Sequence, residues 1–222
     1  MRCLFLLTVI HDLYFNLLEI LTHIRHGEKM FIMNRLLLIF IFTLSFQSLS
    51  KAEDIRDFEI EGISIGDSLL NFVSEEYIDN QKPFIYPKSK KFKEYRVDIQ
   101  LLQYDMITVT VKASDNQYII YSMMADLSFR NNFNKCKTKK NQILKEIKNV
   151  IGEFEKEEDD RYERSLDKSG NSYDESTTIY FKNGDNIRVI CTNWSETMDN
   201  GDRLTIAINT EEFFDWLLNK AY

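Results

Sequence analysis

Apolar residues recur at every second position along several segments of the chain, and this period of two predicts β-strands. The clearest segment runs from Ile119 to Phe129, where every second side chain is apolar. Seven strands are expected, over residues 55–60, 95–102, 107–111, 119–129, 179–181, 187–191 and 204–208. Asn183-Gly184 and Asn200-Gly201, which lie between the last three strands, are typical of hairpin turns.

Helical spacing is strongest between residues 138 and 154, where apolar side chains would share one face of a helix. Thr138 or Asn134 is expected to cap this helix. Two shorter helices are expected, one near residue 68 and one after Asn209.

The expected order is strand, helix, three strands, helix, three strands, helix. One helix followed by three strands occurs twice, at 67–129 and 138–208, which would fit a structural repeat, although the two halves share no obvious residue pattern. With or without a repeat, the order predicts an α+β fold. We expect an antiparallel sheet of about six to seven strands with helices packed on one face.

The N-terminal region has the features of an export signal. Residues 33–52 combine a short basic start, an apolar stretch and small residues before position 53, and predict a signal peptide cleaved between Ala52 and Glu53. The apolar stretch is shorter than the roughly 20 residues that a membrane span needs. Residues 1–32 are interpreted as a non-native upstream extension, with Met33 as the true start. The alternative is an uncleaved anchor made of both apolar segments.

Removal of this leader would leave an acidic domain. Residues 53–222 hold 23 Lys and Arg against 32 Asp and Glu, a net charge of −9. They are expected to form a single domain, which is long enough to bury a sizeable core. Because phosphate binding needs a positive field, nucleic acid is not expected as a partner.

All three histidines, His11, His23 and His26, lie in the leader. The mature segment therefore lacks the usual general base near neutral pH, the Ser–His and Cys–His pairs of nucleophilic catalysis, and histidine metal ligands. No glycine-rich phosphate loop follows any expected strand. We therefore predict no catalytic residue, no cofactor-binding residue and no metal ligand, and we favour a non-catalytic protein over an enzyme.

Cys136 and Cys191 are the two cysteines of the mature segment. An even pair in an exported chain predicts a disulfide. It would join a position just before the long helix to a strand, and it would close a loop of roughly 55 residues. A redox pair is the alternative, but such pairs usually have the Cys-x-x-Cys spacing.

Two polar segments are candidates for binding. Residues 153–176 are expected to form a long polar loop, and loops of this length are often functional or disordered. Residues 82–93 carry a basic cluster that could meet an anionic lipid or glycan surface. A solvated surface is the alternative for both segments. Trp194 is the tryptophan better placed for exposure.

Acid-rich chains also offer two kinds of catalytic or metal site. Residues 167–171 place oxygen atoms at alternate positions, as calcium loops do, but Gly170 stands at the fourth position instead of the sixth. A solvated loop is therefore favoured over a calcium site. Paired carboxylates could serve a glycosidase, but the sequence cannot choose a pair among so many acids.

Several segments resemble a family of small uncharacterised exported proteins of AT-rich marine alphaproteobacteria. The resemblance covers most of residues 53–222 and implies an exported single domain with no known activity. It is carried by Glu61-Gly62-Ile63-Ser64-Ile65-Gly66-Asp67-Ser68-Leu69-Leu70, Asp167-Lys168-Ser169-Gly170, Cys191-Thr192-Asn193-Trp194-Ser195 and Glu212-Phe213-Phe214-Asp215-Trp216-Leu217.

Together these features predict a periplasmic or secreted, non-catalytic protein that binds an envelope protein or a ligand, through residues 80–93 and 153–176. A carboxylate-based hydrolase of the cell envelope is the alternative function. Membrane contact is expected only through an uncleaved leader, which would anchor the protein at its N-terminus.

Overall fold

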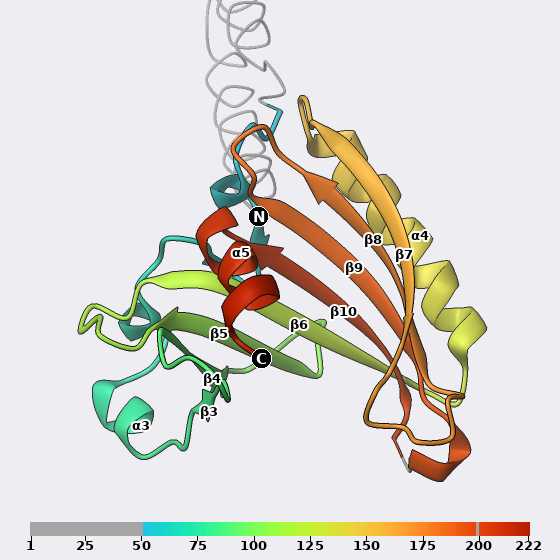
Figure 1. Ribbon diagram of the computed structural model, residues 1–222. Coiled ribbons are helices and arrows are strands. Elements are labelled where there is room, and N and C mark those ends of the chain that lie inside the picture. Colours follow the sequence, from blue (N-terminus) through green and yellow to red (C-terminus); the bar gives the residue numbers. More distant parts are fainter. Residues whose placement is uncertain (1–50, 199) are drawn as a thin grey trace, which may run out of the picture. The chain divides into compact units, whose positions relative to one another are not determined.

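An antiparallel sheet of eight strands organises the chain (Figure 1). The computed structural model describes residues 51–198 and 200–222, so the predictions for residues 1–32 and for nearly all of 33–52 lie outside the described residues. Lys51–Tyr222 forms one compact unit. The prediction of an α+β fold with an antiparallel sheet is confirmed.

The strands follow one another along the chain as two four-stranded meanders. Their order in the sheet is β3-β4-β5-β6-β10-β9-β8-β7, so the last strands of the two meanders, β6 and β10, pair at its centre. Each half therefore has four strands where three are predicted, and the two additional strands, β3 and β7, form the edges. The bounds are β3 Phe84–Ile85, β4 Phe92–Val97, β5 Met106–Lys112, β6 Ile120–Arg130, β7 Lys156–Glu163, β8 Tyr173–Tyr180, β9 Asn186–Asn193 and β10 Asp202–Asn209.

Smaller elements precede and connect these strands. The long helix α4 is capped by Asn132, not by Thr138 or Asn134, and the Asn132 side chain accepts a hydrogen bond from the backbone N–H of Lys135. Thr210 caps α5, because Asn209 is the last residue of β10. The bounds are β1 Glu59–Ile60, β2 Ile63–Ser64, α3 Glu75–Asp79, α4 Phe133–Val150 and α5 Glu211–Lys220, with short 3-10 helices at Ile55–Asp57, Leu69–Asn71 and Glu196–Met198.

One face of the sheet holds the hydrophobic core, and we call it the closed face. Met123, Val189 and Leu204 point from the central strands to this face and are fully buried. α4 contacts β6, β9 and β10, and the segment from Ile55 to Ile78 adds further buried side chains to the same core. The alternation along each strand thus sends its apolar side chains into one continuous core.

The opposite face, which we call the open face, is covered at one end by α5. Phe213 and Trp216 of α5 are buried against Tyr86 and Phe92. Figure 1 shows α5 in front of the sheet and α4 behind it. The helices therefore lie on both faces, and the prediction that they pack on one face is wrong. The pattern of α5 shows that one side of it is apolar, but it does not show which face of the sheet that side meets.

The predicted loop over residues 153–176 is largely an edge strand. β7 (Lys156–Glu163) pairs with β8 along its whole length, from Lys156 opposite Tyr180 to Glu163 opposite Tyr173. All eight residues of β7 are exposed, so the strand does not require apolar and polar side chains to alternate along it. The prediction of a long polar loop here is wrong for these residues, because an exposed edge strand can carry charges on both faces and so shows no apolar alternation.

The predicted disulfide is present. Cys136 in the first turn of α4 and Cys191 on β9 are joined at an S–S distance of 2.00 Å, and both residues are fully buried. The sequence predicts Cys136 just before the helix, but the structure places it inside α4. The bond therefore ties α4 to the closed face of the sheet. Among the described residues, no helix has the length and apolar character needed to cross a membrane.

Candidate functional site

A groove runs over the open face beside α5, with a volume of about 990 Å³. Its floor is formed by alternate residues of the central strands, including Arg188 and Ile190 of β9 and Arg203 and Ala207 of β10. Its apolar wall is formed by α5 and the C-terminus. We call it the open-face groove. Its size and its mixture of apolar walls with a few polar groups are typical of small-molecule sites.

One end of the groove is apolar. Phe84 of β3, Leu218 of α5 and Tyr222 are large side chains that line it although they are 47%, 66% and 62% exposed. The ring of Tyr86 lies edge-on to the rings of Phe84 and Tyr222, with centroids 5.1 and 5.6 Å apart. Exposed apolar side chains clustered in a concave surface mark a place where a ligand or partner can bind.

The other end of the groove is rich in arginine. Arg188 donates from Nη2 to the hydroxyl groups of Tyr162 at 2.7 Å and Ser176 at 3.0 Å. Arg203 has only a loose ion pair with Asp126, at 3.8 Å. The Nε atoms of both arginines are buried, and within the described part of the chain neither has a hydrogen-bond partner. A buried N–H without a partner is costly and calls for a water, an ion or a ligand nearby.

A third guanidinium is already neutralised. Arg164, which follows β7, pairs with the carboxylate of Asp174 at 3.0 Å and donates to Thr192 at 3.2 Å. The Asp174 side chain is only 3% exposed, and it also accepts from the Thr192 hydroxyl. Asp126 accepts from the Thr205 hydroxyl. Three arginines therefore face two carboxylates here, and this end of the groove keeps a positive excess.

Glu94, which is on β4, lies away from these two carboxylates. It accepts a hydrogen bond from the hydroxyl of Tyr86, and burial raises the pKa of Glu94 above its ordinary value. In the strand register, Glu94 lies opposite Thr110, which in turn lies opposite Ser122 of β6. Asp126 is four residues further along β6. Strand spacing places the two acidic backbones about 16 Å apart. The paired carboxyl groups of a glycosidase stand about 5–10 Å apart, so these two suit such a pair poorly.

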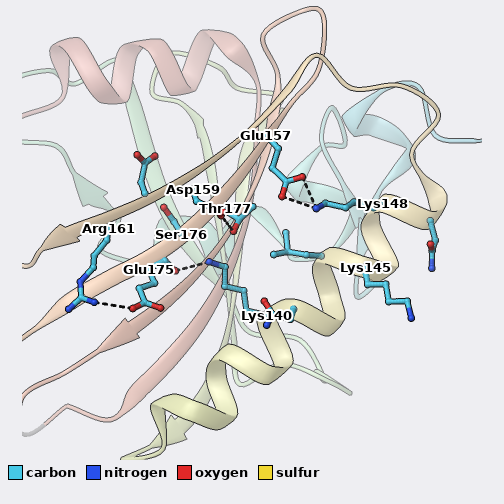
Figure 2. A pocket seen from close by; sticks show the side chains of 13 residues that line it. Lys140, Lys145, Lys148, Glu157, Asp159, Arg161, Glu175, Ser176 and Thr177 are labelled. Atoms are coloured by element: carbon cyan, nitrogen blue, oxygen red, sulfur yellow. Dashed lines mark hydrogen bonds and ion pairs between the residues drawn. The ribbon is translucent and has the colours of Figure 1, made fainter.

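A second hollow lies on the other side of the sheet, between α4 and strands β7 and β8 (Figure 2). Its volume is about 860 Å³, and we call it the α4–β7 crevice. Lys148 of α4 pairs with Glu157 of β7 at 2.6 Å, and Arg161 of β7 pairs with Glu175 of β8 at 3.2 Å. Both of these ion pairs are formed within the protein, without a ligand.

Lys140 is the most enclosed charge of the α4–β7 crevice. It is 9% exposed, and its Nζ donates to the backbone carbonyl of Glu175 at 3.3 Å. Burial lowers the pKa of Lys140, although the nearby carboxylate of Asp159 opposes this effect. Asp159 itself accepts from the Thr177 hydroxyl. Because its most enclosed charge already has a hydrogen-bond partner and its ion pairs are formed within the protein, the crevice is the weaker candidate for a binding site.

The acidic segment that resembles a calcium loop forms a closed turn instead. The carboxylate of Asp167 accepts from the hydroxyls of Ser169, Ser172 and Ser195 at 2.8, 2.6 and 2.7 Å, and from the backbone N–H groups of Ser169 and Ser172. These bonds hold the pKa of Asp167 well below its usual range. Among residues 51–198 and 200–222, no cluster of three or more His, Cys, Asp or Glu side chains is arranged to hold a metal ion.

The basic segment 82–93 supports α5. Trp216 donates from Nε1 to the hydroxyl of Ser89 at 3.0 Å, and Lys91 pairs with Glu212 at 3.0 Å. Trp216 is buried, whereas Trp194 is half-buried with the Arg164 guanidinium 5.0 Å from its ring centroid. The segment thus contributes Phe84 and Tyr86 to the groove, and its lysines are not the residues that line it.

The arginines of the groove are the site residues that sequence reasoning misses. Arg188 alternates with Ile187 and Val189 on β9, so the period of two does place it on the face opposite the core. No sequence signal shows that Arg203 of β10 lies near it. No known protein-family model matches the chain, and no curated protein or solved structure matches it either.

Proposed function

We propose that this chain is an exported, non-catalytic protein that binds a ligand in the open-face groove. The observation that carries the proposal is the pair of guanidinium groups at Arg188 and Arg203, whose buried Nε atoms have no partner within the described residues. They stand in a groove whose opposite end is apolar. A site that is open, concave and electrostatically incomplete is suited to hold a ligand.

The proposed compartment is the periplasm or the extracellular space. The Cys136–Cys191 disulfide supports this proposal, because disulfides persist in oxidising compartments. The signal peptide predicted over residues 33–52, with cleavage between Ala52 and Glu53, would direct the chain to this compartment. Mass spectrometry of the protein isolated from cells tests it: a mature N-terminus at Glu53 is expected, and an intact chain would favour the N-terminal anchor.

The carboxylate-based hydrolase is less well supported by the site. Asp126 and Asp174 each accept hydrogen bonds from hydroxyl groups and form ion pairs with arginines, so both carboxylates are already engaged within the protein. Burial raises the pKa of Glu94, but the strand register places it about 16 Å from Asp126. Four strands separate it from Asp174, so it is too far from either acid to act on the same bond. The open-face groove therefore supports binding better than hydrolysis.

Native mass spectrometry of the protein purified from the cell envelope tests ligand binding. We expect an added small-molecule mass in the wild type that is lost in Arg188→Ala and retained in Lys148→Ala, which removes a charge from the α4–β7 crevice instead. If the added mass survives Arg188→Ala and Arg203→Ala but disappears with Lys148→Ala, the ligand site is the crevice. If every preparation has only the mass of the protein and no small molecule stabilises it, the proposal is wrong.

A further inference from the structure

Resting on the proposed binding function, we propose that the ligand is a small amphipathic anion: an acid group held by Arg188 and Arg203, with an unbranched apolar tail that lies along α5. A long-chain carboxylate has this chemistry. The two ends of the open-face groove differ in the way such a molecule requires, since one is cationic and the other is lined by aromatic and aliphatic side chains.

The acid group would complete the hydrogen bonding of the arginines. Arg188 is on β9 and Arg203 on β10, and the register places Ile190 and Thr205 between them. Both side chains line the groove, and each has an Nε that finds no acceptor in the described structure. A carboxylate between them would offer acceptors to both guanidinium groups, and such charge-assisted bonds are the strong ones.

An apolar track leads away from this point across the floor. Ala207 lies opposite Arg188, Met124 opposite Ala207, and Thr108 opposite Met124. Three strand spacings separate Arg188 from Thr108, about 14 Å. Methionine side chains adapt to the shape of an apolar ligand, so Met124 suits a flexible tail.

The wall beside this track is also apolar and continues to the edge of the sheet. Leu217 and Leu218 of α5 line the groove above the floor, and Phe84 and Tyr222 line its far end. Leu218 and Tyr222 are more than half exposed, so a tail that covers them removes apolar surface from water. A carboxyl group of the protein, Glu94, also lies at this far end, where it accepts a hydrogen bond from Tyr86 and burial raises its pKa.

Titration calorimetry of the full exported protein with defined probes tests the proposal. Dodecanoate is expected to bind, whereas butanoate, which has the acid without the tail, and dodecanol, which has the tail without the acid, should each bind at least about tenfold more weakly. Arg188→Ala and Arg203→Ala should each weaken dodecanoate about tenfold and leave dodecanol unchanged. Leu218→Asp should weaken dodecanoate, and Lys148→Ala should have no effect.

Each alternative outcome is decisive for a different claim. Equal binding of dodecanol and dodecanoate would overturn the role of the arginines, and equal binding of butanoate would overturn the role of the apolar wall. If dodecanoate fails to bind and fails to displace a ligand that co-purifies with the protein, the amphipathic-anion proposal is wrong while ligand binding stands. If no ligand co-purifies and none of the probes binds, both proposals fail. The probe comparisons use the wild type, so they hold even if a variant does not fold.

Discussion

The two faces of the sheet use the same strands for opposite purposes. On β6, Met123 is fully buried in the closed face, while its neighbour Met124 lines the groove of the open face. On β10, Leu204 enters the core and Arg203 faces the groove. Antiparallel sheets commonly bury one face and solvate the other. Here α5 covers part of the solvated face, and a groove forms beside this helix.

This difference separates stability from binding. The closed face has continuous apolar packing and the disulfide, so it holds the larger of the two buried clusters. The open face then tolerates arginines with unsatisfied N–H groups, an arrangement that costs free energy. Substitutions on the closed face should therefore lower the free energy of unfolding, whereas substitutions on the open face should mainly weaken ligand binding.

The largest effect is expected from the disulfide on the closed face. Replacing Cys136 and Cys191 together with serine should lower the free energy of unfolding by about 4 kcal/mol, because the denatured chain is no longer constrained by the closed loop. Urea denaturation with and without reductant measures this effect. Reductant should destabilise the wild type by the same amount and leave the double variant unchanged. A loss below about 1 kcal/mol would show that the bond adds little to the closed face.

Met123 and Met124 offer a matched test of the two faces. Met123→Ala should cost about 3 kcal/mol, because it leaves a cavity in the core. Met124→Ala should cost less than about 1 kcal/mol, because its side chain is half-buried in the groove. Urea denaturation gives both values, and dodecanoate titration should rank the two variants in the reverse order. Similar losses of stability would contradict the separation of the faces.

Asp167 tests how the loops at one end of the sheet are fastened. Its folded pKa lies below the value of an unfolded aspartate, so its stabilising effect is present above about pH 4 and is lost as the pH falls below it. Asp167→Asn should lower the melting temperature by a few degrees at neutral pH, because an amide cannot accept the same hydrogen bonds. The difference between variant and wild type should shrink in acid. A constant difference from pH 6 to pH 3 would contradict this origin.

The smallest effect is expected at Glu212, which anchors α5 over the open face. Lys112 and Lys91 lie 2.9 and 3.0 Å from its carboxylate. Burial opposes ionisation, but the two ammonium groups hold the pKa of Glu212 below its ordinary value. Glu212→Gln should cost less than about 1 kcal/mol, since the groups are partly exposed, and the loss should disappear in high salt. A loss that persists in salt would indicate a packing role for this side chain.

The alternation of apolar residues predicts the inner strands well because each of them has one buried face. The two strands of the eight-stranded sheet that it misses, β3 and β7, are the edges of that sheet. β3 spans only Phe84–Ile85, and β7 is exposed on both faces, so neither has a core side to impose a period of two. The disulfide could be predicted because only Cys136 and Cys191 remain after residue 53.

The groove could not be predicted because it depends on contacts between distant segments. α5 meets the open face through Tyr86 and Phe92, and Arg203 comes near Arg188 only through the pairing of β9 and β10. Arg164 lies in the segment expected to be a loop, and its contacts with Asp174 and Thr192 require β7 to be a strand. The sequence shows which side of each element is apolar, but it does not show which elements share the polar side.

The pairing of β6 with β10 at the centre of the sheet sets the order in which the chain can fold. β6 ends at Arg130, but its inner neighbour begins only at Asp202, near the C-terminus. β6 therefore has one unpaired edge until almost the whole chain has been synthesised. Contacts of such long sequence separation form slowly. The eight-stranded sheet is therefore complete only when one of the last strands of the chain, β10, has paired with β6.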